Sequence, residues 1–277
     1  MAGEVMVLTG CASGIGLHLA GVMADRGCRL LATDIDETAL ATRAQERGWD
    51  PARVLLRRLD VRSEAGWEEA LDAVEQAFGD VDVVMNIAGV LRPAYVQDIR
   101  PEDVDMHFSV NVTGTVLGTR AAARRMIPRR AGHIINFGSL ASLAPVPGLS
   151  VYSASKFAVR GFSLAVAAEL REHGVAVTVI LPDAVQTPML DMQVQYEEAA
   201  LTFSGDRPLR VDEIAGLIVD QVLPRRPMEV TLAAPRVRAL AARLANTAPE
   251  AAQVLSPLLT RKGRRAQERI RQVRGRA

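Results

Sequence analysis

A tyrosine and a lysine stand four residues apart in the chain, at Tyr152 and Lys156. On a helix this spacing places both side chains on one face. A phenol has an ordinary pKa of about 10 and is a poor base at neutral pH. A neighbouring ammonium group favours the phenolate and lowers that pKa toward the range in which general acid–base catalysis is efficient. Taken alone, the pair is a weak motif, because any surface helix can carry it by chance.

A serine precedes this pair at Ser139, just after the apolar run 133–137, which predicts a buried strand. A hydroxyl group at the end of that strand can hydrogen-bond the oxygen that Tyr152 protonates or deprotonates. The serine, the tyrosine and Lys156 together predict proton transfer at a substrate oxygen.

A glycine-rich turn follows the first apolar run, 5–8, and opens into a helical pattern that extends to residue 26. Its glycines, Gly10, Gly14 and Gly16, have the spacing G-x-x-x-G-x-G rather than the commoner G-x-G-x-x-G. Glycines let the backbone approach a pyrophosphate, and the helix N-terminus adds amide donors and partial positive charge. Strand, turn and helix in this order predict a dinucleotide-binding site.

Asp34 lies eighteen residues after Gly16, at the end of a second apolar strand. A carboxylate at this point accepts hydrogen bonds from an adenosine ribose diol and repels a 2′-phosphate. The next residues, Ile35 and Asp36, supply no positive charge. The sequence therefore favours NAD over NADP as the cofactor.

Taken in order, these motifs resemble the short-chain dehydrogenase/reductase family over residues 4–234. The resemblance implies that Tyr152 is the catalytic acid/base and that Ser139 polarises or orients the substrate oxygen. It implies that Lys156 lowers the pKa of the tyrosine and holds the nicotinamide ribose, while Asn111 supports a water relay behind the lysine.

The resemblance also implies a set of cofactor contacts, with Asp60 at the adenine and the segment 86–89 behind the cofactor. The full set is Gly10, Ser13, Gly14, Ile15, Gly16, Asp34, Asp60, Val61, Asn86, Ala88, Gly89, Tyr152, Lys156, Pro182, Val185 and Thr187. The chain departs from the family twice, with Ile87 in place of a second asparagine and Asp183 in place of a glycine. The second departure puts an acid near the nicotinamide end, where it bears on substrate preference.

The order of the elements predicts an α/β fold, a single-domain doubly wound (Rossmann-type) parallel sheet of about seven strands with helices on both faces. Strands are expected near 5–9, 29–33, 53–58, 81–86, 132–137, 175–181 and 228–233. Helices are expected near 14–26, 36–47, 63–78, 101–129, 151–173 and 211–223. We expect the Rossmann domain to cover 1–234, with a substrate lid near 187–210, and a helical extension with a basic tail to cover 235–277.

The two longest expected helices carry small residues on what we interpret as surplus faces. These are Gly114, Gly118, Ala121 and Ala122 on the first, and Ala154, Ala158, Gly161, Ala165 and Ala168 on the second. In the family such helices pair across a dimer axis, so we expect a homodimer or homotetramer. The alternative is that both helices only pack against their own sheet.

Composition agrees with a soluble enzyme, since 277 residues with 49% apolar content suffice for one α/β domain with a large core. The first strand begins within five residues, which leaves no room for a signal peptide, and no apolar stretch is long enough to span a bilayer. We therefore expect a cytoplasmic protein. The two cysteines, Cys11 and Cys28, form no disulfide framework, and no His/Cys cluster has metal-ligand spacing. The four histidines are interpreted as surface or structural residues.

Two apolar segments are expected to line the substrate pocket, and neither offers an arginine for a carboxylate or phosphate. Their residues are Leu140, Leu143, Pro145, Val146, Pro147 and Leu149, followed by Pro188, Met189, Leu190, Met192, Leu201 and Phe203. Such a wall suits a lipophilic alcohol or ketone, such as a steroid or a fatty chain. The alternative is that these residues pack a lid against its own body.

Residues 260–277 hold eight basic residues and one acidic residue, a net charge of +7. Because the whole chain carries +1, the remainder carries −6. An apolar helical pattern precedes this tail. Three interpretations stay open: a solvated tail or one docked on a partner subunit, a peripheral contact with an anionic membrane surface, and a nucleic-acid contact. No nucleic acid is expected, because no aromatic residues are interleaved with the basic residues of the tail and no nucleic-acid-binding module is recognisable.

The sequence thus predicts an NAD(H)-dependent oxidoreductase that interconverts a secondary alcohol and a ketone on a lipophilic substrate. One alternative is a 3-oxoacyl or other ketone reductase of the same family. An alternative of another class is a non-catalytic NAD(H)-sensing binding protein. The intact set Asn111, Ser139, Tyr152 and Lys156 argues against the sensor, which needs no tuned phenol.

Overall fold

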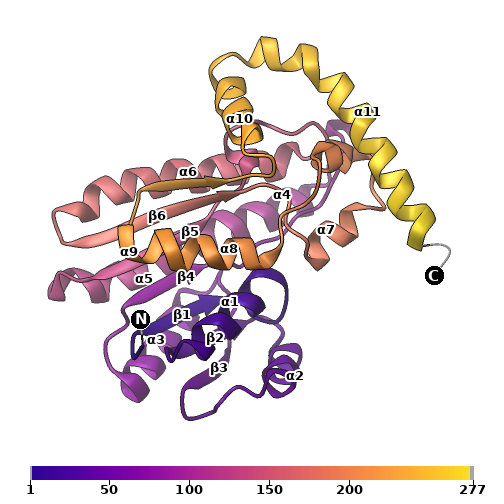
Figure 1. Cartoon of the computed structure of the whole chain (residues 1–277). Coiled ribbons are helices and arrows are strands. Elements are labelled where there is room, and N and C mark those ends of the chain that lie inside the picture. Colours follow the sequence, from indigo (N-terminus) through magenta and orange to yellow (C-terminus); the bar gives the residue numbers. More distant parts are fainter. Residues whose placement is uncertain (1, 275–277) are drawn as a thin grey trace.

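The computed structural model describes residues 2–274 and contains a seven-stranded parallel sheet in the order β3-β2-β1-β4-β5-β6-β7 (Figure 1). The strands are β1 (Val5–Thr9), β2 (Arg29–Asp34), β3 (Val54–Arg58), β4 (Val83–Asn86), β5 (Gly132–Phe137), β6 (Val175–Pro182) and β7 (Glu229–Leu232). The chain order reverses between β1 and β4, which is the switch point where doubly wound sheets bind ligands. The predicted fold class is confirmed, and every strand lies within two residues of its expected limits.

The helices alternate with the strands up to β7, and two further helices follow. They are α1 (Gly14–Asp25), α2 (Glu37–Arg47), α3 (Glu64–Phe78), α4 (Pro101–His107), α5 (Gly114–Arg129), α6 (Ser150–Arg171), α7 (Pro188–Gln193), α8 (Val211–Leu217), α9 (Leu223–Arg225), α10 (Val237–Thr247) and α11 (Pro249–Arg274). Local sequence sets several of these limits. At α2, for example, the Asp36 carboxylate accepts the Ala39 N–H at 2.9 Å, and Gly48 ends the helix in the left-handed conformation with φ 62°.

Apolar side chains cover both faces of the sheet, as a central parallel sheet requires. On one face Met6 and Leu8 of β1 pack with side chains from α1 and α8. On the other face Val5 and Val7 pack with side chains from α3, α5 and α6. All five residues of β1 are buried, so the strand holds the glycine-rich turn rigidly at its carboxyl end.

The single helix expected over 101–129 is divided into three parts. Between α4 and α5 lies a π-helical segment, Phe108–Thr113, which places the buried Asn111 at its centre. A second π-helical segment, Ile218–Val222, separates α8 from α9 within the helix expected over 211–223. Wide turns of this kind are rare and often occur at functional sites, and apolar periodicity does not reveal them.

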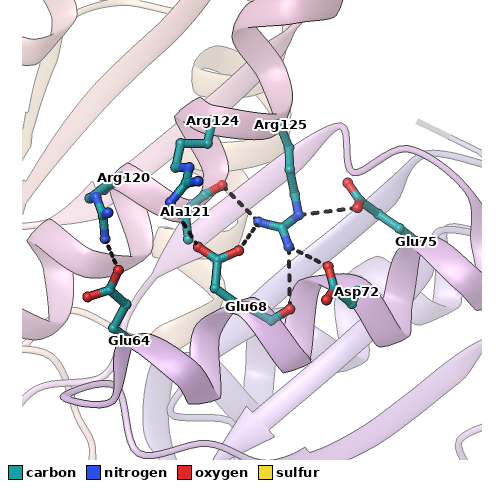
Figure 2. A network of polar contacts seen from close by, with 8 residues as sticks. All are labelled: Glu64, Glu68, Asp72, Glu75, Arg120, Ala121, Arg124 and Arg125. Carbon is teal, nitrogen blue, oxygen red and sulfur yellow. Dashed lines mark hydrogen bonds and ion pairs between the residues drawn. The ribbon is translucent and has the colours of Figure 1, made fainter.

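Helices α3 and α5 are joined at the surface by a network of ion pairs (Figure 2). The Arg125 guanidinium contacts Glu68 at 2.8 Å, Asp72 at 2.6 Å and Glu75 at 3.2 Å. Its side chain is only 15% exposed, and those of Glu68 and Glu75 are 35% and 29% exposed, so these two pairs are less accessible to water than ordinary surface pairs. The network fixes α5 against α3, and α5 follows directly on the segment that carries Asn111.

The small residues of α5 do not form a surplus face, so that interpretation is wrong. A Cβ atom on Gly118 would lie 2.5 Å from the Trp67 ring, and one on Gly114 would lie 2.6 Å from a Val61 methyl group. These glycines, with the buried Ala121 and Ala122, let α5 pack closely against its own chain. On α6, by contrast, the small residues Ala154, Gly161, Ala165 and Ala168 are exposed in the single chain. A homo-oligomer remains a prediction.

The C-terminal helix α11 lies along α7 and the 3-10 segment Glu197–Ser204 of its own chain (Figure 1, yellow helix), which are the parts of the predicted substrate lid that we call the lid below. The buried Gln267 amide donates to the carbonyls of Gln193 at 3.1 Å and Tyr196 at 2.9 Å. A Cβ atom on Gly263 would lie 1.8 Å from the Ala200 carbonyl oxygen, so glycine permits the closest approach of helix and lid.

Basic side chains of α11 take part in this contact. The Lys262 ammonium pairs with Asp206 at 2.9 Å, and the Arg271 guanidinium donates to the Val194 carbonyl at 2.8 Å. None of the three interpretations of the basic tail that the sequence left open included docking of the tail on the lid of its own chain. Arg276, part of the basic tail, lies outside the described residues. Within residues 2–274, no helix has the length and apolar character needed to cross a membrane.

Candidate active site

The glycine-rich turn between β1 and α1 forms a cradle that only glycine can build. Gly10 and Gly14 have positive φ angles of 72° and 56°. A Cβ atom on Gly16 would lie 2.1 Å from the Gly10 carbonyl oxygen. The side chain of Ser13, the N-cap residue, bonds to no helix amide, so the first turn of α1 keeps donors for an anion. Together with Ile15, these residues fit a dinucleotide pyrophosphate.

The Asp34 carboxylate stands beside this cradle at the end of β2. It accepts the Ala12 N–H at 2.9 Å and the Asp36 N–H at 3.0 Å. These two backbone bonds fix its orientation relative to the glycine turn, as a ribose-binding carboxylate requires. Cys11, in the same turn, is fully buried, and burial raises the pKa of its thiol, which agrees with a space-filling role.

Other expected cofactor residues divide into surface groups and internal supports. Asp60 bonds to the Arg62 guanidinium at 2.6 Å, and this hydrogen bond lowers the pKa of its carboxyl group. The Val61 side chain is buried, and the Val61 carbonyl oxygen accepts the Trp67 indole N–H at 2.9 Å. The Asn86 amide is buried and donates to Asn136 at 2.8 Å, so this side chain joins β4 to β5 and supports the cofactor wall from inside.

The segment after β4 is held by a threonine of the glycine turn. The Thr9 hydroxyl oxygen accepts the N–H groups of Ile87 at 2.9 Å and Ala88 at 3.0 Å. Gly89 follows, and a Cβ atom there would lie 3.2 Å from the Asn111 side-chain oxygen and 3.5 Å from Lys156 Nζ. The glycine therefore keeps this wall open in front of the catalytic residues.

The four predicted catalytic residues converge from three elements. Lys156 and Tyr152 lie on α6, with Nζ 5.8 Å from the centre of the tyrosine ring, and Ser139 lies two residues beyond the end of β5, where its hydroxyl group acts to lower the pKa of the phenol. Lys156 Nζ also donates to the Phe137 carbonyl at 2.8 Å. The Asn111 side chain bonds to the backbone of the neighbouring loop and to the Ser155 hydroxyl at 3.0 Å, which ties the π-helical segment to α6.

The electrostatics differ from the expectation that Lys156 lowers the pKa of the tyrosine. Burial raises the pKa of Tyr152 above its ordinary value of 10.0, and the neighbouring Ser139 hydroxyl group offsets only part of this effect. Burial lowers the pKa of Lys156 to about 8. Desolvation therefore acts on both groups toward the neutral Tyr–Lys pair in the free protein.

A buried histidine next to this site was assigned only a structural or surface role from sequence. The His107 ring makes an edge contact with the Tyr152 ring at a centroid distance of 6.3 Å. Its Nε2 accepts the Arg92 N–H at 3.0 Å, and its Nδ1 lies 2.5 Å from the Asp103 carbonyl oxygen, so Nδ1 carries the proton. Burial lowers its pKa, and the neutral ring supports the tyrosine. The signal in the sequence that could have placed His107 at the site is its position four residues before Asn111.

A cavity of about 1080 Å³ opens in front of Ser139, Tyr152 and Lys156. Pro182, Val185 and Thr187 lie on its wall, where the resemblance placed the nicotinamide end. Most of the predicted apolar residues also line it, namely Leu140, Pro145, Val146, Pro147, Leu149, Met189, Leu190 and Leu201.

Four predicted pocket residues do not line the cavity. Leu143 packs in the body of the protein, and Met192 and Phe203 are lid residues that pack with Leu91 and Leu149 of the body, as the alternative interpretation expected. Pro188 is the first residue of α7. Sequence reasoning missed the opposite wall, which α10 and α11 form with Val237, Arg238, Ala241, Leu244, Ala245 and Leu259. No group of three or more His, Cys, Asp or Glu side chains in the described chain could hold a metal ion.

A family model for short chain dehydrogenases matches residues 4–198. The chain belongs to the short-chain dehydrogenase/reductase family. It is 33% identical to momilactone A synthase of Oryza sativa subsp. japonica over 78% of this chain and 81% of the relative. It is 35% identical to D-threitol dehydrogenase of Mycolicibacterium smegmatis over 68% and 72% of the two chains.

A solved structure of a short-chain dehydrogenase/reductase from Burkholderia phymatum in complex with NAD is also similar, with a TM-score of 0.78 and 29% identity. The match covers 90% of this chain and 95% of that one. The proteins of this family are oxidoreductases. Membership in the family agrees with the glycine cradle and with the arrangement of Ser139, Tyr152 and Lys156 described above.

Proposed function

We propose that the protein is an NAD-dependent dehydrogenase that oxidises the secondary alcohol group of a lipophilic substrate. The observation that carries this proposal is the placement of Ser139 and Tyr152 on the wall of a large, mostly apolar cavity. Within the described chain, the charged residues that line it are Lys156, Asp183 and Arg238, and the last two form an ion pair. A neutral, apolar molecule with one hydroxyl or carbonyl group suits such a cavity.

Asp34 supports NAD over NADP. Its carboxylate stands beside the glycine cradle, held by the Ala12 N–H at 2.9 Å, and repels a 2′-phosphate at that position. The next residue, Ile35, is 52% exposed and offers no cation to a phosphate. The NAD complex of the similar Burkholderia phymatum protein adds support.

The proposed chemistry assigns one task to each side chain. Bound NAD would accept the hydrogen that leaves the substrate carbon with its electron pair. In its phenolate form, Tyr152 takes the hydroxyl proton as a general base, while Ser139 holds the same oxygen in place. Lys156 supports the tyrosine and donates to a ribose hydroxyl. Asn111, bonded to the Ser155 hydroxyl at 3.0 Å, keeps the π-helical segment against the helix that carries the base.

A direct test measures NADH formation with a panel of secondary alcohols that runs from short aliphatic chains to steroids. We expect turnover with NAD, much lower efficiency with NADP, and a kcat/KM that rises with apolar length. Turnover with none of the alcohols, in a protein that binds NAD, would contradict the proposal and favour a cofactor-sensing protein. Faster reduction of the matching ketones with NADPH would instead support a ketone reductase.

A further inference from the structure

An acid that departs from the family pattern and an arginine from the C-terminal extension meet at the cavity wall. Asp183 follows directly after β6, and its carboxylate contacts Arg238 Nε at 2.6 Å and Nη2 at 3.4 Å. Arg238 Nη1 also donates to the Ser204 hydroxyl at 3.2 Å. One guanidinium thus joins the loop after β6, the lid and α10.

Backbone bonds fix the acid independently of this arginine. The Asp183 N–H donates to the Leu232 carbonyl at 2.8 Å, and its Oδ1 accepts the Ala184 N–H at 2.9 Å. The Asp183 side chain is 11% exposed and that of Arg238 is 22% exposed. The carboxylate therefore stays at the cavity wall whether or not the guanidinium is present.

We propose that the Asp183–Arg238 pair determines substrate specificity. Asp183 occupies the Arg238 guanidinium, which would otherwise bind an acidic substrate, and so the pair reserves the cavity for neutral molecules. This inference rests on the proposed function in one respect, the lipophilic nature of the substrate. A substrate carboxylate near the pair meets a guanidinium already bound to Asp183 and a fixed negative charge beside it. A neutral group meets an ion pair with no net charge, next to the apolar side chains of α10.

The pairing has a converse consequence that can be measured. If the charge of Asp183 is removed, a partly buried guanidinium remains without its carboxylate partner, which is unfavourable. A ligand carboxylate then replaces the missing partner with a charge-assisted hydrogen bond. Loss of Asp183 should therefore create a carboxylate subsite at Arg238, not merely weaken the protein.

The test compares hydroxy fatty acids with their methyl esters as substrates, because the two differ in charge but hardly in length. The wild-type enzyme should prefer the esters. Asp183→Asn keeps an oxygen for the Ala184 N–H and removes the charge, and it should shift the acid-to-ester ratio of kcat/KM about tenfold toward the acids, equivalent to about 1.4 kcal/mol. Adding Arg238→Met to this variant should abolish the shift. Asp183→Gly, which carries the usual family residue, serves as the second variant.

A comparable ion pair away from the cavity provides the matched control. Glu229 and Arg160 lie 2.5 Å apart with side-chain exposures of 16% and 26%, and neither residue lines the cavity. Glu229→Gln should lower the melting temperature as Asp183→Asn does but leave the ratio unchanged. An unchanged ratio in both Asp183 variants would show that the pair is structural only and would overturn the proposal.

Calorimetry with decanoate and decanol separates this inference from the proposed function. In the presence of NAD, Asp183→Asn should bind decanoate about tenfold more tightly than the wild type does, with decanol unchanged. If no alcohol is turned over but this difference is found, the proposed function fails and the specificity role stands. Equal decanoate affinities would contradict the specificity role whatever the turnover.

Discussion

His133 should make the protein sensitive to mild acid. Its ring is 1% exposed on β5, and Nε2 lies 2.8 Å from the Thr178 hydroxyl oxygen. That hydroxyl donates its own proton to the Pro227 carbonyl at 2.5 Å, so Nε2 must be the donor to Thr178. Nδ1 has no hydrogen-bond partner in the described structure. A second proton would therefore place a charged donor in the core without an acceptor, and burial lowers the pKa to about 3.

The sign and size of the effect follow from linkage. The pKa is lowered from 6.5 in the unfolded chain, so the unfolded state binds the proton first as the pH falls. The contribution of neutral His133 to the free energy of unfolding is fully present above about pH 6.5 and is lost progressively between pH 6.5 and 3. At pH 5 His133 has lowered the free energy of unfolding by about 2 kcal/mol. This loss has nearly the same size for any pKa of His133 in the folded state that is below about 4.

Urea unfolding between pH 5 and 7.5, at fixed ionic strength and protein concentration, measures this loss. His133→Gln retains a donor for Thr178 but cannot be protonated in this range, so its free energy of unfolding should fall less than that of the wild type, by about 2 kcal/mol at pH 5. His173→Gln, at an exposed position, should follow the wild-type profile. Parallel profiles for the wild type and His133→Gln would refute the reasoning. Buried His107 remains in all three proteins, so its effect cancels.

Three further outcomes are expected. Gly16→Ala should abolish NAD binding measured by calorimetry, because the new methyl group would lie 2.1 Å from a backbone oxygen of the cradle; a normal Kd would contradict the cradle. Asp34→Ala combined with Ile35→Arg should weaken NAD and admit NADP, and equal wild-type efficiency with both cofactors would count against the role of Asp34. Gln267→Leu removes two hydrogen bonds to the lid, worth about 1 kcal/mol each, and should raise KM severalfold. The exposed Gln272→Leu should not raise it, and equal KM values for both variants would show that α11 does not hold the lid.

Features encoded by local patterns could be predicted from the sequence. The strands followed from short apolar runs, and the cradle followed from glycines that terminate such a run at Gly10 and Gly16. The side chains of Ser139, Tyr152 and Lys156 do meet, because the carboxyl end of a parallel strand faces the N-terminal half of the helix that follows it.

The remaining features depend on contacts between distant segments. One wide turn shifts the apolar pattern of a helix by a single residue, and the pattern alone did not reveal this shift, so the π-helical segment around Asn111 was missed. The glycines of α5 were assigned to a free face because composition does not reveal that Trp67 fills the space beside Gly118. The docking of α11 on the lid and the approach of Arg238 to Asp183 join residues more than fifty positions apart. No local pattern encodes such pairings.

The central claim is that Tyr152 transfers the proton in an NAD-dependent reaction, and one comparison tests it most directly. Tyr152→Phe keeps the ring that packs against His107 and removes only the hydroxyl group. With NAD and a lipophilic secondary alcohol, the variant should retain at most a few per cent of the wild-type rate of NADH formation. Its Kd for NAD should stay nearly unchanged. A variant that retains a larger share of the wild-type rate would contradict the assignment of Tyr152 as the acid/base.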